Sequence, residues 1–213
     1  VHHLTMPSVG AVVNYLLAAV NVSRPVRLRG TPIDNDMAAL CEMLEECGIE
    51  IHYDTEGEIS IASHGYDTES THVIECPPDR NVAMTWLAYG AVSEGLTING
   101  MPIDMLKAGI DIYRQIGCQI VIIDDLRLRI SKGTVPIENI TVVAAGLNAD
   151  FHSDWLPQLE VVAAIRGLTM TCYDMLFSQR VRQAEILAEM GADVTISGGL
   201  LPDGLAPFWG EDP

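Results

Sequence analysis

An aspartate at the predicted start of a helix has the clearest potential for acid–base chemistry in this chain. Asp154 follows His152-Ser153 and precedes an apolar segment that begins at Trp155. A carboxylate near a helix start, shielded from water, can accept a proton from an attacking hydroxyl group. The alternative is that Asp154 is a second capping residue beside Ser153. The residue types alone favour neither interpretation.

Two arginines are candidates for binding an anion. Arg180 could hold a carboxylate or a phosphate through two parallel hydrogen bonds, or it could belong to a surface cluster with Arg182. Asp79 and Arg80 occupy the turn before another predicted helix. They could form a buried ion pair that fixes this turn, or they could contact a substrate directly. The sequence leaves both pairs of alternatives open.

A third candidate is the segment Pro7-Ser8-Val9-Gly10-Ala11, which opens the first apolar helix. The backbone N–H groups of Ser8, Val9 and Gly10 would point out of the helix start, where the helix dipole favours an anion. The alternative is that Ser8 is an ordinary N-cap.

Composition argues against several classes of function. The chain has 12 basic and 29 acidic residues and a net charge of −17, which opposes general binding to nucleic acid or to a membrane surface. The histidines show no ligand spacing, and the five cysteines show no metal-type pairing. No apolar run reaches the roughly 18 residues of a membrane span, and no signal peptide opens the chain. We therefore expect a cytoplasmic protein with free thiols and no metal site.

The elements that must position these residues follow a pattern that occurs three times. A polar or proline-containing turn opens an apolar helix, and a strand, a second helix and a further strand follow. The second helices end at Gly48, Gly117 and Gly191, and glycine suits the left-handed position after a helix. A repeat of roughly 70 residues is too long for a solenoid unit and fits a βαβαββ module. The sequence thus predicts an α/β (α+β) fold of repeated units.

Hydrophobic periodicity places the elements of each repeat. The first repeat has a helix over 9–22, a strand over 26–29, a helix with an apolar stripe from Met37 to Leu44, and a hairpin of 50–53 and 59–61. The second has helices over 81–93 and 105–116 and strands over 96–99, 120–123 and 126–130. The third has helices over 155–165 and 180–190, a strand over 169–173 and a last strand from about Ala192.

The polar stretch 64–76 separates the first repeat from the second, so we predict one domain over 1–72 and another over 73–213. Residues 198–213 are rich in Gly and Pro and do not complete a hairpin. The last repeat is therefore expected to be truncated.

Four motifs, in order, resemble the enolpyruvyl transferase superfamily, and most closely the UDP-N-acetylglucosamine enolpyruvyl transferases (1-carboxyvinyltransferases) of peptidoglycan synthesis. The segment 7–11 matches the uridine-diphosphate loop, and Pro78-Asp79-Arg80 matches the Pro-Asp-Arg turn. Phe151-His152-Ser153-Asp154 with Gln158 matches the Phe-Pro-Thr-Asp segment, and 177–180 matches Phe-Glu-Asn-Arg. The resemblance implies an inside-out α/β barrel of six units in two lobes, of which this chain has three.

The resemblance also implies a reaction. Enolpyruvyl would pass from phosphoenolpyruvate to a hydroxyl of a nucleotide sugar through a tetrahedral intermediate, with release of phosphate and without a metal or organic cofactor. Asp154 would take the hydroxyl proton. The substrate-binding residues would be Ser8, Val9, Gly10, Asp79, Arg80, Leu176 and Arg180.

Other features separate the chain from the family pattern. It has no counterpart of the family's N-terminal Lys-Asn pair, of the loop with the reactive cysteine and arginine, or of the late arginine that binds phosphoenolpyruvate. We therefore expect the isolated chain to be inactive unless another chain supplies the missing units. Trp155 replaces a smaller residue, which could alter the pocket, and Ser178 replaces a glutamate.

Two alternative functions follow from these differences. A non-catalytic chain would only bind a uridine nucleotide or play a structural role. Because Asp34 and Asp36 replace two family glutamates, the acceptor could instead be uridine monophosphate, as in nucleoside-antibiotic synthesis. A relationship to RNA 3′-phosphate cyclases is disfavoured by the acidic composition.

Overall fold

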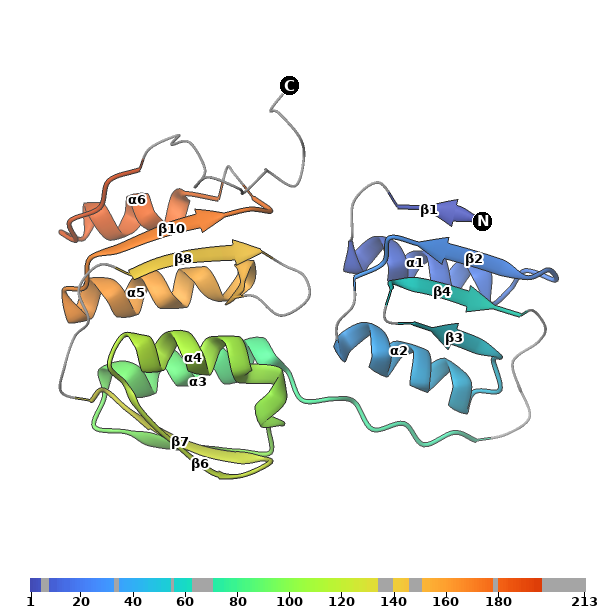
Figure 1. Ribbon diagram of the computed structural model, residues 1–213, viewed down its shortest axis with the longest axis horizontal. Coiled ribbons are helices and arrows are strands. Elements are labelled where there is room, and N and C mark those ends of the chain that lie inside the picture. Colours follow the sequence, from blue (N-terminus) through green and yellow to red (C-terminus); the bar gives the residue numbers. More distant parts are fainter. Residues whose placement is uncertain are drawn as a thin grey trace. The chain divides into compact units, whose positions relative to one another are not determined.

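The chain forms two compact units, Val1–Pro77 and Pro78–Pro213, which are considered one at a time (Figure 1). The computed structural model describes residues 1–4, 8–32, 35–54, 56–62, 71–133, 140–145, 151–177 and 180–196. The predicted domain boundary near residue 72 lies shortly before the division at Pro77. Residues 198–213 and most of the predicted polar linker lie outside the described residues.

The first unit is a complete βαβαββ module. Its elements are β1 (His2–His3), α1 (Val9–Ala19), β2 (Val26–Arg29), α2 (Asn35–Glu46), β3 (Ile51–Tyr53) and β4 (Glu58–Ile61). The sheet has the order β1-β2-β4-β3, in which β1 is parallel to β2 and the other neighbours are antiparallel. The predicted hairpin is confirmed, and Gly48 has the expected positive φ of 84° after α2.

Both helices of the first unit bury one apolar stripe against the sheet. The stripe predicted for α2 is confirmed at Met37, Cys41 and Leu44, which are buried. Its neighbours in the core come from α1 and the strands: Val12, Leu16, Leu28, Ile59 and Ile61. Helix α1 ends at Ala19, before the predicted Val22. The side-chain amide of Asn21 donates to the Leu17 carbonyl at 3.0 Å, which satisfies an acceptor of the last turn.

The second unit contains the other two repeats. The first of them comprises α3 (Arg80–Val92), β5 (Leu96–Asn99), the 3₁₀ turn η1 (Ile103–Leu106), α4 (Lys107–Gln115), β6 (Gln119–Asp124) and β7 (Arg127–Ser131). The second comprises β8 (Ile140–Ala145), β9 (Phe151–His152), the 3₁₀ turn η2 (Ser153–Trp155), α5 (Leu156–Arg166), β10 (Met170–Asp174) and α6 (Arg182–Glu189).

These elements place helices between two sheets. The antiparallel sheet β5-β7-β6 and the parallel sheet β10-β8-β9 lie on opposite sides of α3, α4 and α5 (Figure 1). Fully buried side chains from these helices, from η1 and from β7 contribute to the core: Met84, Leu87, Leu106, Tyr113, Leu128, Ile130 and Leu159. Helices inside and sheets outside are the arrangement that the predicted fold requires.

Two glycines allow helices to approach their neighbours closely. A Cβ on Gly90 of α3 would overlap Cγ2 of Ile130 on β7. A Cβ on Gly109 of α4 would lie 2.5 Å from Sδ of Met84 on α3. Both contacts are tighter than van der Waals distance permits, so the packing of α3 against β7 and α4 depends on the missing side chains.

The third repeat departs from the prediction in two places. Residues 192–196 form no strand, because no described strand lies beside them and an isolated strand has no ladder to join. The strands β8 and β9 were not predicted, because both lie between the elements predicted for the second and third repeats. Strand β8 pairs with β10 and buries Ile140, Val142 and Ala144.

The close approach at Gly90 yields a stability prediction. We expect Gly90→Ala to lower the free energy of unfolding of the second unit by about 1–3 kcal/mol, because the new methyl group has no room. The matched control is Gly10→Ala in α1, where an added Cβ would meet no atom within 4 Å. The control should gain about 0.5–1 kcal/mol from helix propensity. Urea unfolding measures both, and a Gly90→Ala variant as stable as the parent would contradict the packing.

Candidate active site

Asp154 lies in η2, the turn that connects β9 to α5, and its side chain is 47% exposed. One carboxylate oxygen, Oδ1, is 3.0 Å from Nη1 of Arg180, and the other, Oδ2, is 3.7 Å from Nδ1 of His152. Among the described residues, no backbone N–H group at the start of α5 donates to this carboxylate. Asp154 thus presents a charged, accessible carboxylate, and the capping interpretation has no support in the geometry.

Ser153, next to Asp154, is fully buried and faces inward. Its Oγ donates to the carboxylate of Asp174, 3.0 and 2.9 Å from the two oxygens. The same carboxylate accepts the N–H groups of Leu176 at 3.0 Å and Phe177 at 2.9 Å. Asp174 therefore joins the turn after β9 to the turn after β10. Sequence reasoning considered Ser153 only as a cap and did not identify Asp174.

Asp174 could be found from the sequence only if its strand were known to share a sheet with the strand before Ser153. It ends the strand β10, and Ser153 comes directly after the strand β9; both strands belong to one parallel sheet. Polar groups at the carboxyl ends of strands in such a sheet meet at one edge, which is where α/β proteins place their sites. The predicted strand over 169–173 stopped one residue before this aspartate.

Arg180 is part of the same cluster. Its Nη1 is 3.2 Å from Ser153 Oγ and 3.3 Å from the Ser153 carbonyl oxygen, in addition to its contact with Asp154. Its Cζ lies 3.9 Å from the ring centroid of Phe177. Arg182 instead pairs with Glu185 at 2.9 Å on the exposed face of α6. The interpretation of Arg180 and Arg182 as one surface cluster is therefore wrong.

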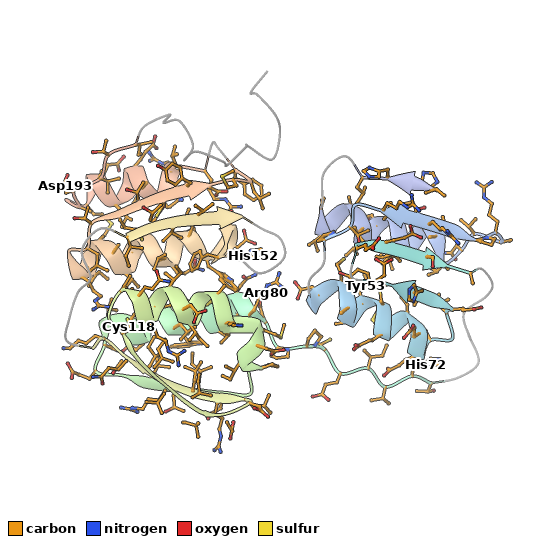
Figure 2. The ribbon with its side chains drawn as sticks, viewed as in Figure 1. Tyr53, His72, Arg80, Cys118, His152 and Asp193 are labelled. Atoms are coloured by element: carbon orange, nitrogen blue, oxygen red, sulfur yellow. The ribbon has the colours of Figure 1, made fainter. Side chains whose placement is uncertain are left out.

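Arg80, the first residue of α3, reaches His152, the neighbour of Asp154. It is only 9% exposed, and its Nη2 is 3.3 Å from Nε2 of His152; Figure 2 shows the two labelled side chains close together. Asp79 is the N-cap of α3, where its Oδ1 accepts the N–H groups of Asn81 at 2.7 Å and Val82 at 3.3 Å. The structure thus uses the Asp79 carboxylate to begin the helix that carries Arg80.

The Trp155 side chain is buried and joins η2 to the start of α3. It is 3% exposed, and its Nε1 donates to Oδ1 of Asn81 at 2.8 Å, which ties η2 to the start of α3. Its ring meets Phe151 edge-on at 5.6 Å and lies 5.6 Å from His152 at a tilt of 39°. The expectation that Trp155 alters the pocket is not supported by this buried position.

Two titratable side chains near Asp174, Glu160 and Cys172, have pKa values that are shifted by burial. Burial raises the pKa of the Glu160 carboxyl; the nearby Asp174 adds to the rise, and a hydrogen bond with Gln183 opposes it. Burial also raises the pKa of the Cys172 thiol to about 12, with a further contribution from Glu160. Cys172 is therefore a protonated thiol at neutral pH and cannot act as a nucleophile here.

The predicted site residues fall in both units. The second unit brings together Arg80, Asp154, Leu176 and Arg180, with Asp79 at the start of α3. In the first unit Ser8 caps α1 and accepts the Ala11 N–H at 3.3 Å, as the N-cap interpretation predicts. The roles of Ser8, Val9 and Gly10 in binding a nucleotide stay a prediction. Pro7, Asp34 and Ser178 lie outside the described residues.

The described part of the chain holds no group of three or more His, Cys, Asp or Glu side chains arranged to bind a metal ion. It also has no helix with the length and apolar character needed to cross a membrane.

The hydrogen bonds of Asp174 yield a second stability prediction. Asp174→Ala would leave the buried Ser153 hydroxyl and two N–H groups without their acceptor, so we expect a loss of about 2–4 kcal/mol in the unfolding of the second unit. Asp154→Ala is the matched control and should cost less than about 1 kcal/mol, because its ion pair is exposed. Equal losses in urea unfolding would contradict the anchoring role of Asp174.

Known proteins are similar to this chain in sequence. The chain is 28% identical over 202 residues to UDP-N-acetylglucosamine 1-carboxyvinyltransferase 2 of Caldanaerobacter subterraneus subsp. tengcongensis, covering 92% of this chain and 46% of that protein. It is 25% identical over 195 residues to UDP-N-acetylglucosamine 1-carboxyvinyltransferase of Sulfurovum sp., covering 91% and 45%. The chain therefore spans about half the length of the curated relatives it matches.

A solved structure and a protein family complete the comparison. The enolpyruvyl transferase NikO from Streptomyces tendae has the same fold, with a TM-score of 0.71 and 20% identity, over 88% of this chain and 44% of that one. The predicted resemblance and the α/β fold with a partial set of units are thus confirmed. The family described as EPSP synthase (3-phosphoshikimate 1-carboxyvinyltransferase) matches residues 2–206, and the chain belongs to this family.

Proposed function

We propose that this chain supplies the proton-accepting side of an enzyme that transfers the enolpyruvyl group of phosphoenolpyruvate to a nucleotide-sugar hydroxyl, with a UDP-N-acetylglucosamine-like acceptor. The names of the relatives and the shared motifs support this choice of reaction. Such a reaction would belong to the synthesis of peptidoglycan precursors in the cytoplasm.

The observation that carries the proposal is the environment of Asp154. Its carboxylate is accessible, while every group that orients it is buried or half-buried: Ser153 beneath it, Arg180 at 3.0 Å and His152 at 3.7 Å. A carboxylate held in one place but open to a ligand suits a general base, because proton transfer requires hydrogen-bond contact with the reacting hydroxyl. A helix cap would have used its oxygens on backbone N–H groups.

In the proposed reaction, Asp154 takes the proton of the acceptor hydroxyl as its oxygen bonds to C2 of phosphoenolpyruvate, and the C2–C3 double bond opens as an acid from the missing units gives a proton to C3. In the second step a C3 proton returns to a base among those units, the double bond forms again, and phosphate leaves C2. Arg180 and Arg80, which lie beside Asp154 and His152, would supply positive charge for the carboxylate and phosphate of phosphoenolpyruvate. Asp79 and Leu176 would flank the acceptor, and Ser8, Val9 and Gly10 would bind its uridine nucleotide.

The proposed reaction requires no metal or organic cofactor, and it needs groups that this chain does not carry. The Lys-Asn pair, the loop with the reactive cysteine and arginine, and the late arginine would come from other units, in the same native protein or on another chain. Neither nucleic acid nor a membrane has a role in this proposal.

Two alternative functions differ from this proposal, one in the acceptor and one in the absence of any reaction. If the acceptor is uridine monophosphate, as the replacement of two family glutamates by Asp34 and Asp36 suggests, the same base would act on a smaller nucleotide. If the chain is a non-catalytic uridine-nucleotide-binding or structural protein, Asp154 would have no effect on any turnover.

The role of Asp154 is tested in a complete enzyme that contains this segment. Asp154→Asn should lower kcat by about 10²–10⁴-fold, because the amide cannot take the proton. Nucleotide affinity should stay within a few-fold, because the amide is nearly isosteric. The control is Glu189→Gln on α6, an exposed acid that pairs only with Arg182 among the described residues. Near-parental kcat in the Asp154 variant on its correct acceptor would leave no catalytic role for this residue.

A separate prediction concerns the 213-residue chain by itself. Because it lacks the lysine and the reactive loop, we expect little or no phosphate release from phosphoenolpyruvate and a uridine acceptor. A phosphate-release assay with the isolated chain measures this directly. Robust turnover would show that these groups are dispensable and would refute the assignment of a partial active site.

A further inference from the structure

Phe177 places the face of its aromatic ring against the guanidinium of Arg180. The Cζ atom of Arg180 lies 3.9 Å from the centre of the ring. An approach in the plane of the ring would keep the two groups farther apart, because the hydrogens of the ring would lie between them. The cation is therefore above the ring face, which carries the negative end of the ring quadrupole and attracts a positive charge.

The hydrogen bonds of the Arg180 side chain all come from one nitrogen. Nη1 is 3.0 Å from Oδ1 of Asp154, 3.2 Å from Oγ of Ser153 and 3.3 Å from the Ser153 carbonyl oxygen. Contacts through a single nitrogen fix the position of that nitrogen more firmly than the plane of the whole group, which can still swing about it. A second constraint is needed to fix the plane, and the ring of Phe177 supplies one.

The backbone of Phe177 is held on both sides. Its N–H group donates to Oδ1 of Asp174 at 2.9 Å, and its carbonyl oxygen accepts the N–H group of Arg180 at 2.9 Å. The side chain is 45% exposed, so these backbone contacts, and not burial in the core, determine where the ring lies. The alternative is that the turn alone brings the ring and the guanidinium together, and that the ring has no effect on Arg180.

A ring face attracts the cation without using its N–H donors. Among the described residues, neither Nε nor Nη2 of Arg180 donates a hydrogen bond. An acidic side chain in place of the ring would accept from these nitrogens, whereas an aromatic face leaves them to a ligand. Nε and Nη2 form one edge of the planar group, and this edge can donate two parallel hydrogen bonds to a carboxylate or a phosphate.

We infer that Phe177 is a positioning residue for Arg180: its ring face fixes the plane of the guanidinium, so that Nη1 contacts Asp154 and Ser153 while the edge of Nε and Nη2 is directed to an anionic ligand. The inference deepens the proposed function and rests on it only for the identity of that anion, the carboxylate or phosphate of phosphoenolpyruvate. The restraint of the guanidinium by the ring does not depend on any reaction.

A series of fluorinated rings tests whether the ring face holds the cation. Fluorine withdraws negative charge from the face and changes the size of the ring little, so mono-, di- and trifluorophenylalanine at position 177 weaken the attraction stepwise. The readout is ¹⁵N relaxation of the Arg180 Nε–H group in the 213-residue chain, identified as the signal that Arg180→Lys removes. We expect the amplitude of its motion to rise with each fluorine. An equal amplitude across the series would overturn the inference.

Two substitutions complete the test. Phe177→Leu keeps an apolar side chain but has no ring face, so the Arg180 Nε–H group should approach the mobility of Arg24, an exposed arginine of the first unit. Phe177→Tyr keeps the ring face and should keep the parental mobility. An equally restrained Arg180 in Phe177→Leu would show that the turn and the hydrogen bonds of Nη1 suffice, and would overturn the inference.

Two controls separate this effect from damage to the fold. Tyr89→Leu removes another exposed ring, on α3, and should leave the Arg180 signal unchanged. The indole N–H signal of Trp155, which donates to Asn81, should keep its position in every variant that is interpreted. None of these measurements involves turnover. They can therefore overturn the role of Phe177 while the proposed reaction stands, and a near-parental kcat in Asp154→Asn would refute the proposed base while the ring contact stands.

Discussion

The hydrogen bonds between the Asp174 carboxylate and Ser153 are the contact on which the rest of the site depends. A buried hydroxyl without a partner is costly, and the half-buried carboxylate of Asp174 satisfies it here. Because the same carboxylate also accepts two N–H groups from the turn after β10, it sets the distance between that turn and η2. Ser153 faces inward for this reason, and its neighbour Asp154 is left facing outward, within reach of Arg180. The outward orientation of the Asp154 side chain thus follows from the hydrogen bonds that Ser153 makes with Asp174.

A second constraint comes from the packing of helices between sheets. Because Gly90 and Gly109 have no side chains, α3 lies close to β7 and α4, and its N-terminus is brought to the edge of the parallel sheet. Trp155 then joins this N-terminus to η2 through Asn81. Arg80, one residue before Asn81, is consequently buried next to His152. Arg80 thereby adds a positive charge from a different repeat than the one that carries Asp154 and Arg180.

Much of this organisation could be predicted from the sequence, for identifiable physical reasons. Helix caps such as Ser8 and glycines such as Gly48 act over a few residues, so the helices and hairpins near them were located correctly. Interactions between distant segments were not accessible in this way. The pairing of Ser153 with Asp174 requires that β8, β9 and β10 share one sheet, and β8 reads only as an apolar run. Arg180 and Arg182 look equivalent in sequence, but in the fold Arg180 contacts Asp154 and Arg182 pairs with Glu185 on α6. The strand expected at Ala192 follows the repeat pattern, but a strand also needs a neighbour to pair with.

The distance from Asp154 to the reacting hydroxyl is the most direct test of the proposed chemistry. A crystal structure of the complete native protein with its nucleotide acceptor bound would measure it. The proposed role predicts that a carboxylate oxygen of Asp154 lies within hydrogen-bond reach of the acceptor hydroxyl, about 2.6–3.2 Å, with Arg180 still on the other oxygen. An acceptor bound with every hydroxyl beyond this reach, and with no single water bridging the gap, would contradict it.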